Sequence, residues 1–203
     1  FRRLGADGNA FVSLQYVDGV SDPRWRDRLR GELEARLKVM RRGRAKLFLM
    51  GVGNAKPPLS EIVSALEAMA KLRDEGLVEN IGLSCHELGH FGFIADAIER
   101  TDLVDYMMVR YNWKHRDAAD RLLPLAKARD IGVVAMKVFC WDCGPGQWVR
   151  RISVFEPTRD AERLSPEPTP AQRSLQWCWS HPAMAAVVPS INAEWEAEMN
   201  IRA

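Results

Sequence analysis

The chain has 203 residues, of which 47% are hydrophobic and 28% are charged, and its formal net charge is +2. This size and composition indicate one globular domain, residues 1–203, with a substantial core. The small net charge argues against nucleic acid or an anionic membrane surface as a partner, and no apolar run approaches the length of a membrane-spanning helix. The four cysteines do not resemble a disulfide framework, so we expect a reducing, cytoplasmic location.

Short apolar segments alternate with amphipathic segments along the chain. Runs rich in β-forming residues predict six strands, at residues 11–17, 46–50, 80–84, 103–109, 131–139 and 185–189. Apolar residues spaced three and four apart predict helices at 25–40, 60–76, 87–100, 117–129, 169–179 and from 193 to the end. Gly43 suits the C-terminal end of the first helix, and Pro124 predicts a kink or a late start of the fourth.

This sixfold βα order predicts a parallel sheet with helices outside it. Two architectures fit, namely an open doubly wound sheet and a (β/α)8 barrel that lacks two units. An open dinucleotide-binding sheet usually carries a G-x-G-x-x-G fingerprint after its first strand. Residues 18–22 read DGVSD instead, which favours an α/β TIM-type barrel with six of its βα units present.

Several segments then resemble those of a known family. Residues 76–84, GLVENIGLS, are similar to the GKVRxIGxS element of the aldo-keto reductases. Further stretches keep that family's order and spacing, at residues 104–112, 131–137, 169–177 and 187–190, with Asn200. The resemblance implies a (β/α)8 barrel, an NADP(H) cofactor with NAD(H) as the alternative, and reduction of a small-molecule carbonyl substrate.

The same resemblance implies that two βα units precede Phe1 in such a barrel, and that they carry the family's aspartate and its proton-donating tyrosine. We therefore expect the chain to be a fragment of a longer protein or a reduced relative. A barrel without two strands exposes two sheet edges, so an oligomer that covers these edges is a candidate assembly.

The family's tyrosine is assisted by a lysine and a histidine, and the resemblance places these catalytic positions at Gln15 and Gly51. Gln15 can form hydrogen bonds but supplies no positive charge, and Gly51 has no side chain to donate a proton. Tyr16 alternates to the other face of the strand and is a poor substitute. Two hypotheses follow: an NADP(H)-dependent carbonyl reductase with a substituted catalytic set, or a catalytically impaired NADP(H)-binding or interaction protein.

The resemblance implies that the nicotinamide end of the cofactor lies near three residues. Ser84 occupies the strand exit where the family holds the carboxamide, although a serine there also suits a helix N-cap. Met108 stands where a glutamine usually makes a second carboxamide contact. Met136 takes the place of the ring that stacks on nicotinamide, and a thioether can pack there as it can in an ordinary core.

The phosphate and adenine end is implied to lie along the last two βα units. Lys137 can meet the pyrophosphate as a point charge. Ser190 and Asn192 precede the last helix, whose N-terminal amides can bind a phosphate. Asn200 matches the residue that reaches the adenine.

A zinc site is the alternative from another class of function. Cys85, His86 and His90 follow one strand, and the pair Cys140 and Cys143 follows another on the same rim of a barrel. A lone C-x-x-C has many chance occurrences, and a further strand separates the two loops. We therefore assign no metal site from the sequence.

Overall fold

The computed structural model describes residues 11–14, 22, 24–53, 56–139, 168–191 and 193–203. The strands are β1 (Phe11–Leu14), β2 (Ala45–Val52), β3 (Val78–Cys85), β4 (Tyr106–Arg110), β5 (Gly132–Met136) and β6 (Met184–Val188). The α-helices are α1 (Trp25–Met40), α2 (Leu59–Asp74), α3 (Phe91–Glu99), α4 (Leu122–Ala128), α6 (Pro170–Trp179) and α7 (Glu194–Ile201). Short 3-10 turns precede α3 and α4, at Leu88–His90 and Asp117–Ala119. All six predicted strands are therefore present.

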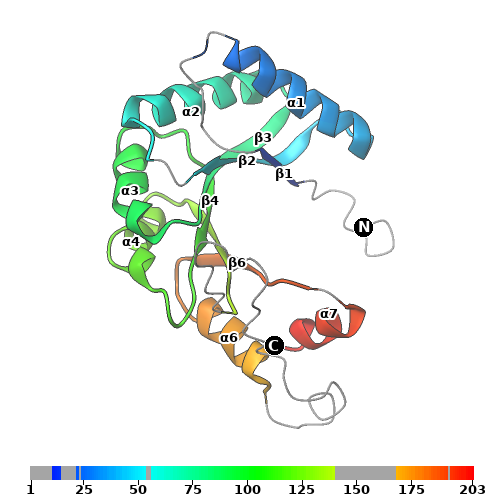
Figure 1. The fold of residues 1–203 in the computed structure, drawn as a ribbon, viewed down its shortest axis with the longest axis vertical. Helices are drawn as coiled ribbons and strands as arrows, with labels where there is room; N and C mark the ends of the chain where they lie inside the picture. The colour runs from blue at the N-terminus through cyan, green and yellow to red at the C-terminus, as the bar shows by residue number, and fades with distance from the viewer. Residues whose placement is uncertain (1–10, 15–21, 23, 54–55, 140–167, 192) are drawn as a thin grey trace.

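The strands pair in parallel and in chain order, β1-β2-β3-β4-β5-β6. A doubly wound sheet reverses its strand order at a switch point, whereas a barrel keeps it. In Figure 1, helices α1, α2, α3 and α4 follow one another around the outer side of the curved sheet. This topology confirms the predicted TIM-type arrangement with six strands and rules out the doubly wound alternative.

The two faces of this sheet differ in burial. Every second residue of a strand packs under the helices in one apolar core, which includes Phe48, Met50, Ile81, Leu83, Met107, Val109 and Val133. The residues between them face the interior of the barrel. Leu47, Met108 and Val134 on that face are only half-buried, and Val188 of β6 is exposed. The interior face of the described sheet is therefore the more open one.

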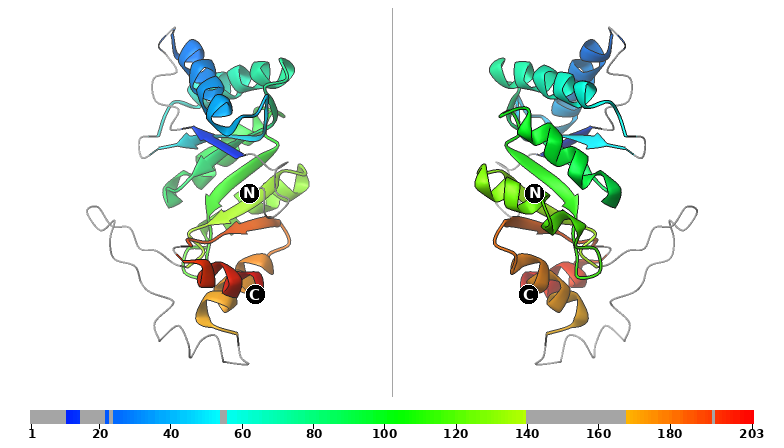
Figure 2. Two further views of the ribbon diagram at one scale, coloured as in Figure 1. Left: turned by 90° about the vertical axis from the view of Figure 1, so that its right-hand side faces the viewer. Right: turned by 90° about the vertical axis from the view of Figure 1, so that its left-hand side faces the viewer.

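Helix α6 begins with a capping box. Thr169 Oγ1 accepts from the Gln172 backbone N–H at 3.2 Å, and Gln172 Oε1 accepts from the Thr169 N–H at 2.9 Å. Gln172 Nε2 also donates to the Met199 carbonyl at 2.9 Å. This bond ties α6 to α7, and the two helices lie together beside β6 at the end of the molecule opposite α1 and α2 (Figure 2).

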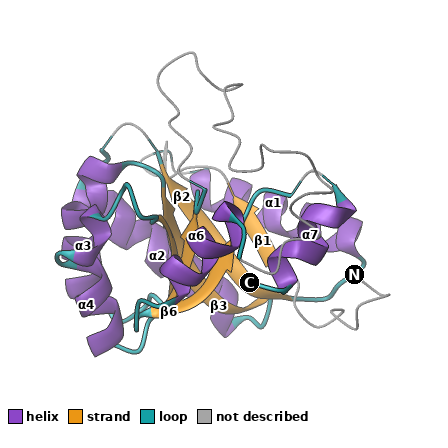
Figure 3. Ribbon diagram, turned by 90° about the horizontal axis from the view of Figure 1, so that it is seen from below, coloured by secondary structure: helices purple, strands orange, loops and turns teal. Residues whose placement is uncertain are grey.

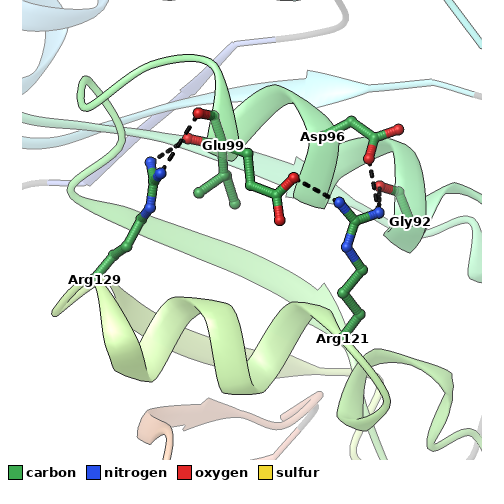
Figure 4. Close-up of polar contacts among 6 residues, drawn as sticks. Gly92, Asp96, Glu99, Arg121 and Arg129 are labelled. Carbon is green, nitrogen blue, oxygen red and sulfur yellow. Dashed lines mark hydrogen bonds and ion pairs between the residues drawn. The ribbon is translucent and has the colours of Figure 1, made fainter.

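Arginines tie α4 to α3 on the outer side of the barrel (Figure 4). Arg121 pairs with Asp96 and Glu99, each at 2.7 Å. Arg129 donates to the Ile98 carbonyl oxygen at 2.6 Å. These groups are largely exposed, so each ion pair adds little stability, and their effect is mainly to orient the two helices.

Seen from below, α7 lies on the flank of the sheet opposite α3 and α4 (Figure 3).

Two expectations concern helix ends. Pro124 is the third residue of α4, so the prediction that this helix starts late, near the proline, is confirmed. Helix α1 ends at Met40 as predicted, but the left-handed C-cap residue is Arg41, with φ 54°, and the expectation that Gly43 caps the helix is wrong. None of the helices in the described residues is long and apolar enough to cross a membrane.

Candidate functional site

Three of the predicted site positions form one row across adjacent strands. In the parallel register, Gly51 of β2 pairs with Ser84 of β3, and Ser84 pairs with Met108 of β4. All three alternate with residues of the helix-side core, so they lie on the interior face. Ser84 is 7% exposed, and its two neighbours are half-buried. The row lies near the carboxyl ends of the strands, where active sites of such barrels are found.

A second row lies one step nearer the rim. Arg110 pairs with Met136 of β5, and Met136 pairs with Val188 of β6. Met136 is 5% exposed and lies outside the helix-side core, as expected for a residue on the interior face. Arg110 is half-buried, and its Nε is buried with no hydrogen-bond partner.

Lys137, directly after β5, has φ 58°. The other described non-glycine residues with positive φ are Arg41 and Asp130, which end helices α1 and α4. A left-handed conformation costs an L-residue about 1–2 kcal/mol. At the exit of a strand it marks a position that neighbouring contacts must hold.

Asn112, two residues beyond β4, provides such a contact. It is fully buried, and its Nδ2 donates to the Lys137 carbonyl at 2.8 Å. Its Oδ1 accepts from the backbone N–H groups of Lys114 at 3.0 Å and His115 at 2.8 Å. One side chain therefore fixes the loop after β4 and joins it to the exit of β5.

The rim of β3, β4 and β5 carries positive charge. His86 follows β3, and its pKa is lowered mainly by burial and then by the charges of Lys137 and Arg110. The carboxylate of Glu87 acts in the opposite direction. The neutral imidazole is therefore favoured at His86, and the local potential suits an anion.

The remaining predicted positions are placed differently. Ser190 is exposed between β6 and α7, whereas Gln15 and Asn192 lie outside the described residues. Asn200 lies on α7, where both Oδ1 and Nδ2 are buried without a hydrogen-bond partner. The structure thus gathers Gly51, Ser84 and Met108 in one row, and it places the other described positions on or after β5, namely Met136, Lys137, Ser190 and Asn200.

Only part of the zinc alternative, namely Cys85, His86 and His90, lies within the described residues. Burial raises the pKa of the Cys85 thiol to about 11, and its Sγ donates to the Glu87 carbonyl at 3.5 Å. Cys140 and Cys143 lie outside the described residues. Within the described ranges, no group of three or more His, Cys, Asp and Glu side chains is able to hold a metal ion.

Sequence reasoning missed Arg110 and Asn112. The signal for Arg110 is its alternation with Tyr106 and Met108, which puts a charge on the interior face. No comparable signal predicts the bond from Asn112 to Lys137, because the two residues are 25 positions apart.

Solved structures share this fold. A thermostable aldo-keto reductase in complex with the inhibitor epalrestat is 21% identical, with a TM-score of 0.67, and the match covers 95% of this chain and 64% of that one. The holo form of an aldo-keto reductase from Bacillus halodurans is 15% identical, with a TM-score of 0.68 and coverage of 95% and 66%. An aldo/keto reductase from Klebsiella pneumoniae, in complex with NADP and acetate, is 18% identical, with a TM-score of 0.63 and coverage of 99% and 72%.

At these identities the likeness concerns the fold, and the chain spans less than two thirds of the length of the first two structures. No curated protein matches the chain. The sequence profile of the Aldo/keto reductase family matches residues 9–140, which is more than half of the sequence and includes β1 to β5. The segments that resemble the family, residues 76–84, 104–112 and 131–137, contribute residues to the two interior rows, namely Ser84, Met108, Arg110 and Met136. The chain therefore belongs to the aldo/keto reductase family.

Proposed function

We propose that the whole protein is an NADP(H)-dependent oxidoreductase that reduces a small carbonyl compound at the carboxyl rim of the barrel, with NAD(H) as the alternative cofactor. The observation that carries this proposal is the row of Gly51, Ser84 and Met108, because segments distant in sequence meet at the end of the sheet that serves catalysis in such barrels. Aldo-keto reductases from Klebsiella pneumoniae with the same fold are known in complex with NADP and with NADPH.

The residues of this chain suit that cofactor at three places. Ser84 offers a hydroxyl to a carboxamide, and the nearly buried thioether of Met136 offers an apolar surface to a nicotinamide ring. Asn200 has an amide donor and acceptor without partners, which match the donor and acceptor edge of an adenine. When bound, the cofactor would supply the hydride.

The proton required by the carbonyl oxygen has no donor at Gly51. In the proposed catalytic set the family's histidine position is Gly51 and its lysine position is Gln15. A glycine at this position leaves more room beside Ser84 than a residue with a side chain would, which favours a bulkier substrate. It also favours a second candidate function, an NADP(H)-binding protein without turnover, because a rim position in register with Ser84 carries no polar group.

Two measurements on the intact protein separate these functions. NADPH binding is followed by calorimetric titration, and hydride transfer is followed with a panel of aldehydes and quinones. We expect Ser84→Ala to weaken NADPH binding by about tenfold, as the loss of one hydrogen bond and its desolvated partner would. Ser180→Ala, at an exposed serine at the end of α6, is the matched control and should leave the affinity unchanged.

Binding together with turnover supports the oxidoreductase. Binding without turnover on any carbonyl compound supports the second candidate. If wild-type protein does not bind NADPH or NADH, both proposals are wrong.

A further inference from the structure

Arg110 is a half-buried guanidinium on the interior face of the barrel. Its neighbours in β4, Met107 and Val109, belong to the helix-side core, so Arg110 shares the opposite face with Tyr106 and Met108. Its Nε is buried and has no hydrogen-bond partner. A buried N–H group without an acceptor costs free energy, so this arrangement is costly unless a ligand supplies the acceptor.

Several other arginines of the described structure do have acceptors. Arg73 pairs with Asp105 at 2.9 Å. Arg121 and Arg129 contact carboxylates and carbonyl groups around α3. These arginines lie outside the barrel, whereas Arg110 points into it. Among the buried side-chain atoms of the described residues that lack a hydrogen-bond partner, the Nε of Arg110 is the one that belongs to an arginine.

Two further basic residues end the neighbouring strands. Cys85, the last residue of β3, is the register partner of Val109 on β4. His86 directly follows Cys85, so it lies level with Arg110, the residue after Val109. Lys137 directly follows Met136, the register partner of Arg110 on β5. Asn112 holds the backbone of Lys137 in its left-handed conformation, so this part of the rim has a defined shape. Three adjacent strand exits thus bring together the positive charges of Arg110 and Lys137 and the imidazole of His86, whose N–H can donate a hydrogen bond to an anion. The carboxylate of Glu87, next to His86, opposes this field in part.

We propose that the rim cluster of Arg110, His86 and Lys137 binds an anionic group of the ligand, a carboxylate or a phosphate, at the mouth of the barrel. A guanidinium suits either anion, since its planar fork matches two acceptor oxygens at once. The anion belongs either to the carbonyl substrate, which would then be an oxo acid or a sugar phosphate, or to a phosphate of the cofactor. This inference rests on the proposed function and refines its substrate class.

Calorimetric titration of the intact protein distinguishes these sources with four probes: inorganic phosphate, 4-oxobutanoate, the uncharged aldehyde butanal, and NADPH. Arg110→Gln removes the charge, and Arg110→Lys keeps the charge without the fork. Arg100→Gln is the matched control, because Arg100 is exposed at the end of α3, at the opposite end of the barrel.

For a substrate anion, we expect wild type to bind 4-oxobutanoate more tightly than butanal by roughly tenfold to a hundredfold, the range of a charge-assisted hydrogen bond. Arg110→Gln should abolish this preference, Arg110→Lys should keep part of it, and Arg100→Gln should keep all of it. If Arg110→Gln instead weakens phosphate and NADPH binding and leaves the two aldehydes unchanged, the anion is the phosphate of the cofactor.

The inference is overturned if both Arg110 variants bind all four probes as wild type does, or if wild type neither binds phosphate nor prefers the charged aldehyde. Phosphate alone requires neither cofactor nor turnover. A protein that binds phosphate through Arg110 but binds neither NADPH nor NADH would keep the anion site and refute the proposed function, so the two failures are distinguishable.

Discussion

Replacing Asn112 with alanine tests whether a single side chain holds the rim of the barrel together. The substitution removes one hydrogen bond to the Lys137 carbonyl and two from the backbone N–H groups of Lys114 and His115. At about 1 kcal/mol for each bond, we expect a loss of about 3 kcal/mol in the free energy of unfolding. For a domain of this size that corresponds to a decrease of roughly 6–12 °C in Tm. Thermal and urea unfolding, followed by circular dichroism, measure it.

Asn80→Ala is the matched control for this substitution. Asn80 donates one bond, at 3.0 Å to the Lys46 carbonyl, near the exposed start of β3. We expect this variant to lose no more than about 1 kcal/mol. If Asn112→Ala and Asn80→Ala lower the stability equally, the three buried hydrogen bonds do not hold the rim and the reasoning is refuted.

Three other predictions concern the interior and the rim. In Gly82→Ala the new Cβ would overlap the Tyr106 carbonyl oxygen and lie 2.9 Å from the Tyr106 ring. Urea unfolding should therefore show a loss of about 1–3 kcal/mol in the free energy of unfolding. In the control Gly132→Ala, the new Cβ would lie 3.6 Å from the Tyr106 side chain, and the loss should be smaller. Cys85, with its pKa raised to about 11 by burial, should remain unmodified by a thiol reagent in the native protein, as mapped by mass spectrometry; rapid native labelling would contradict its burial. Burial and the charges of Lys137 and Arg110 lower the pKa of His86, so His86 takes up a proton more readily in the unfolded chain than in the folded one. The free energy of unfolding should therefore decrease as the pH falls from about 7 to about 5. His86→Gln should show a smaller decrease, and a pH profile identical to that of wild type would argue against the lowered pKa.

The order of the elements was predictable because it depends on local patterns. Strands followed from short apolar runs and helices from apolar residues spaced three and four apart, so a helix was expected at residues 169–179, and α6 is found at Pro170–Trp179. The residue that caps the C-terminal end of α1 was not predicted correctly. Its buried stripe ends at Leu37, whose carbonyl accepts from the Arg42 N–H at 3.0 Å, so the left-handed position falls on Arg41 and not on Gly43.

The sequence predicted only those parts of the candidate site that depend on the alternation of residues within one strand. The alternation along β3 and β4 puts Ser84 and Met108 on the interior face, and the register then joins them. The rim depends on contacts between segments, such as the bond from Asn112 to Lys137 across 25 positions, and no local pattern specifies such a bond. Arg110 lies on the same face of β4 as Met108 by the same alternation, but it was not predicted because the family resemblance implies no role for it.

The most direct test of the central claim, that the interior rim forms an NADP(H) site, is a calorimetric titration of NADPH into wild-type protein and Met136→Ala. Met136 is 5% exposed on the interior face, and its truncation would remove the apolar surface on which the nicotinamide packs. We expect saturable binding by wild type, with one equivalent per chain, and an affinity lower by about tenfold in Met136→Ala. Absence of saturable binding by wild type, or an equal affinity in the two proteins, would contradict it.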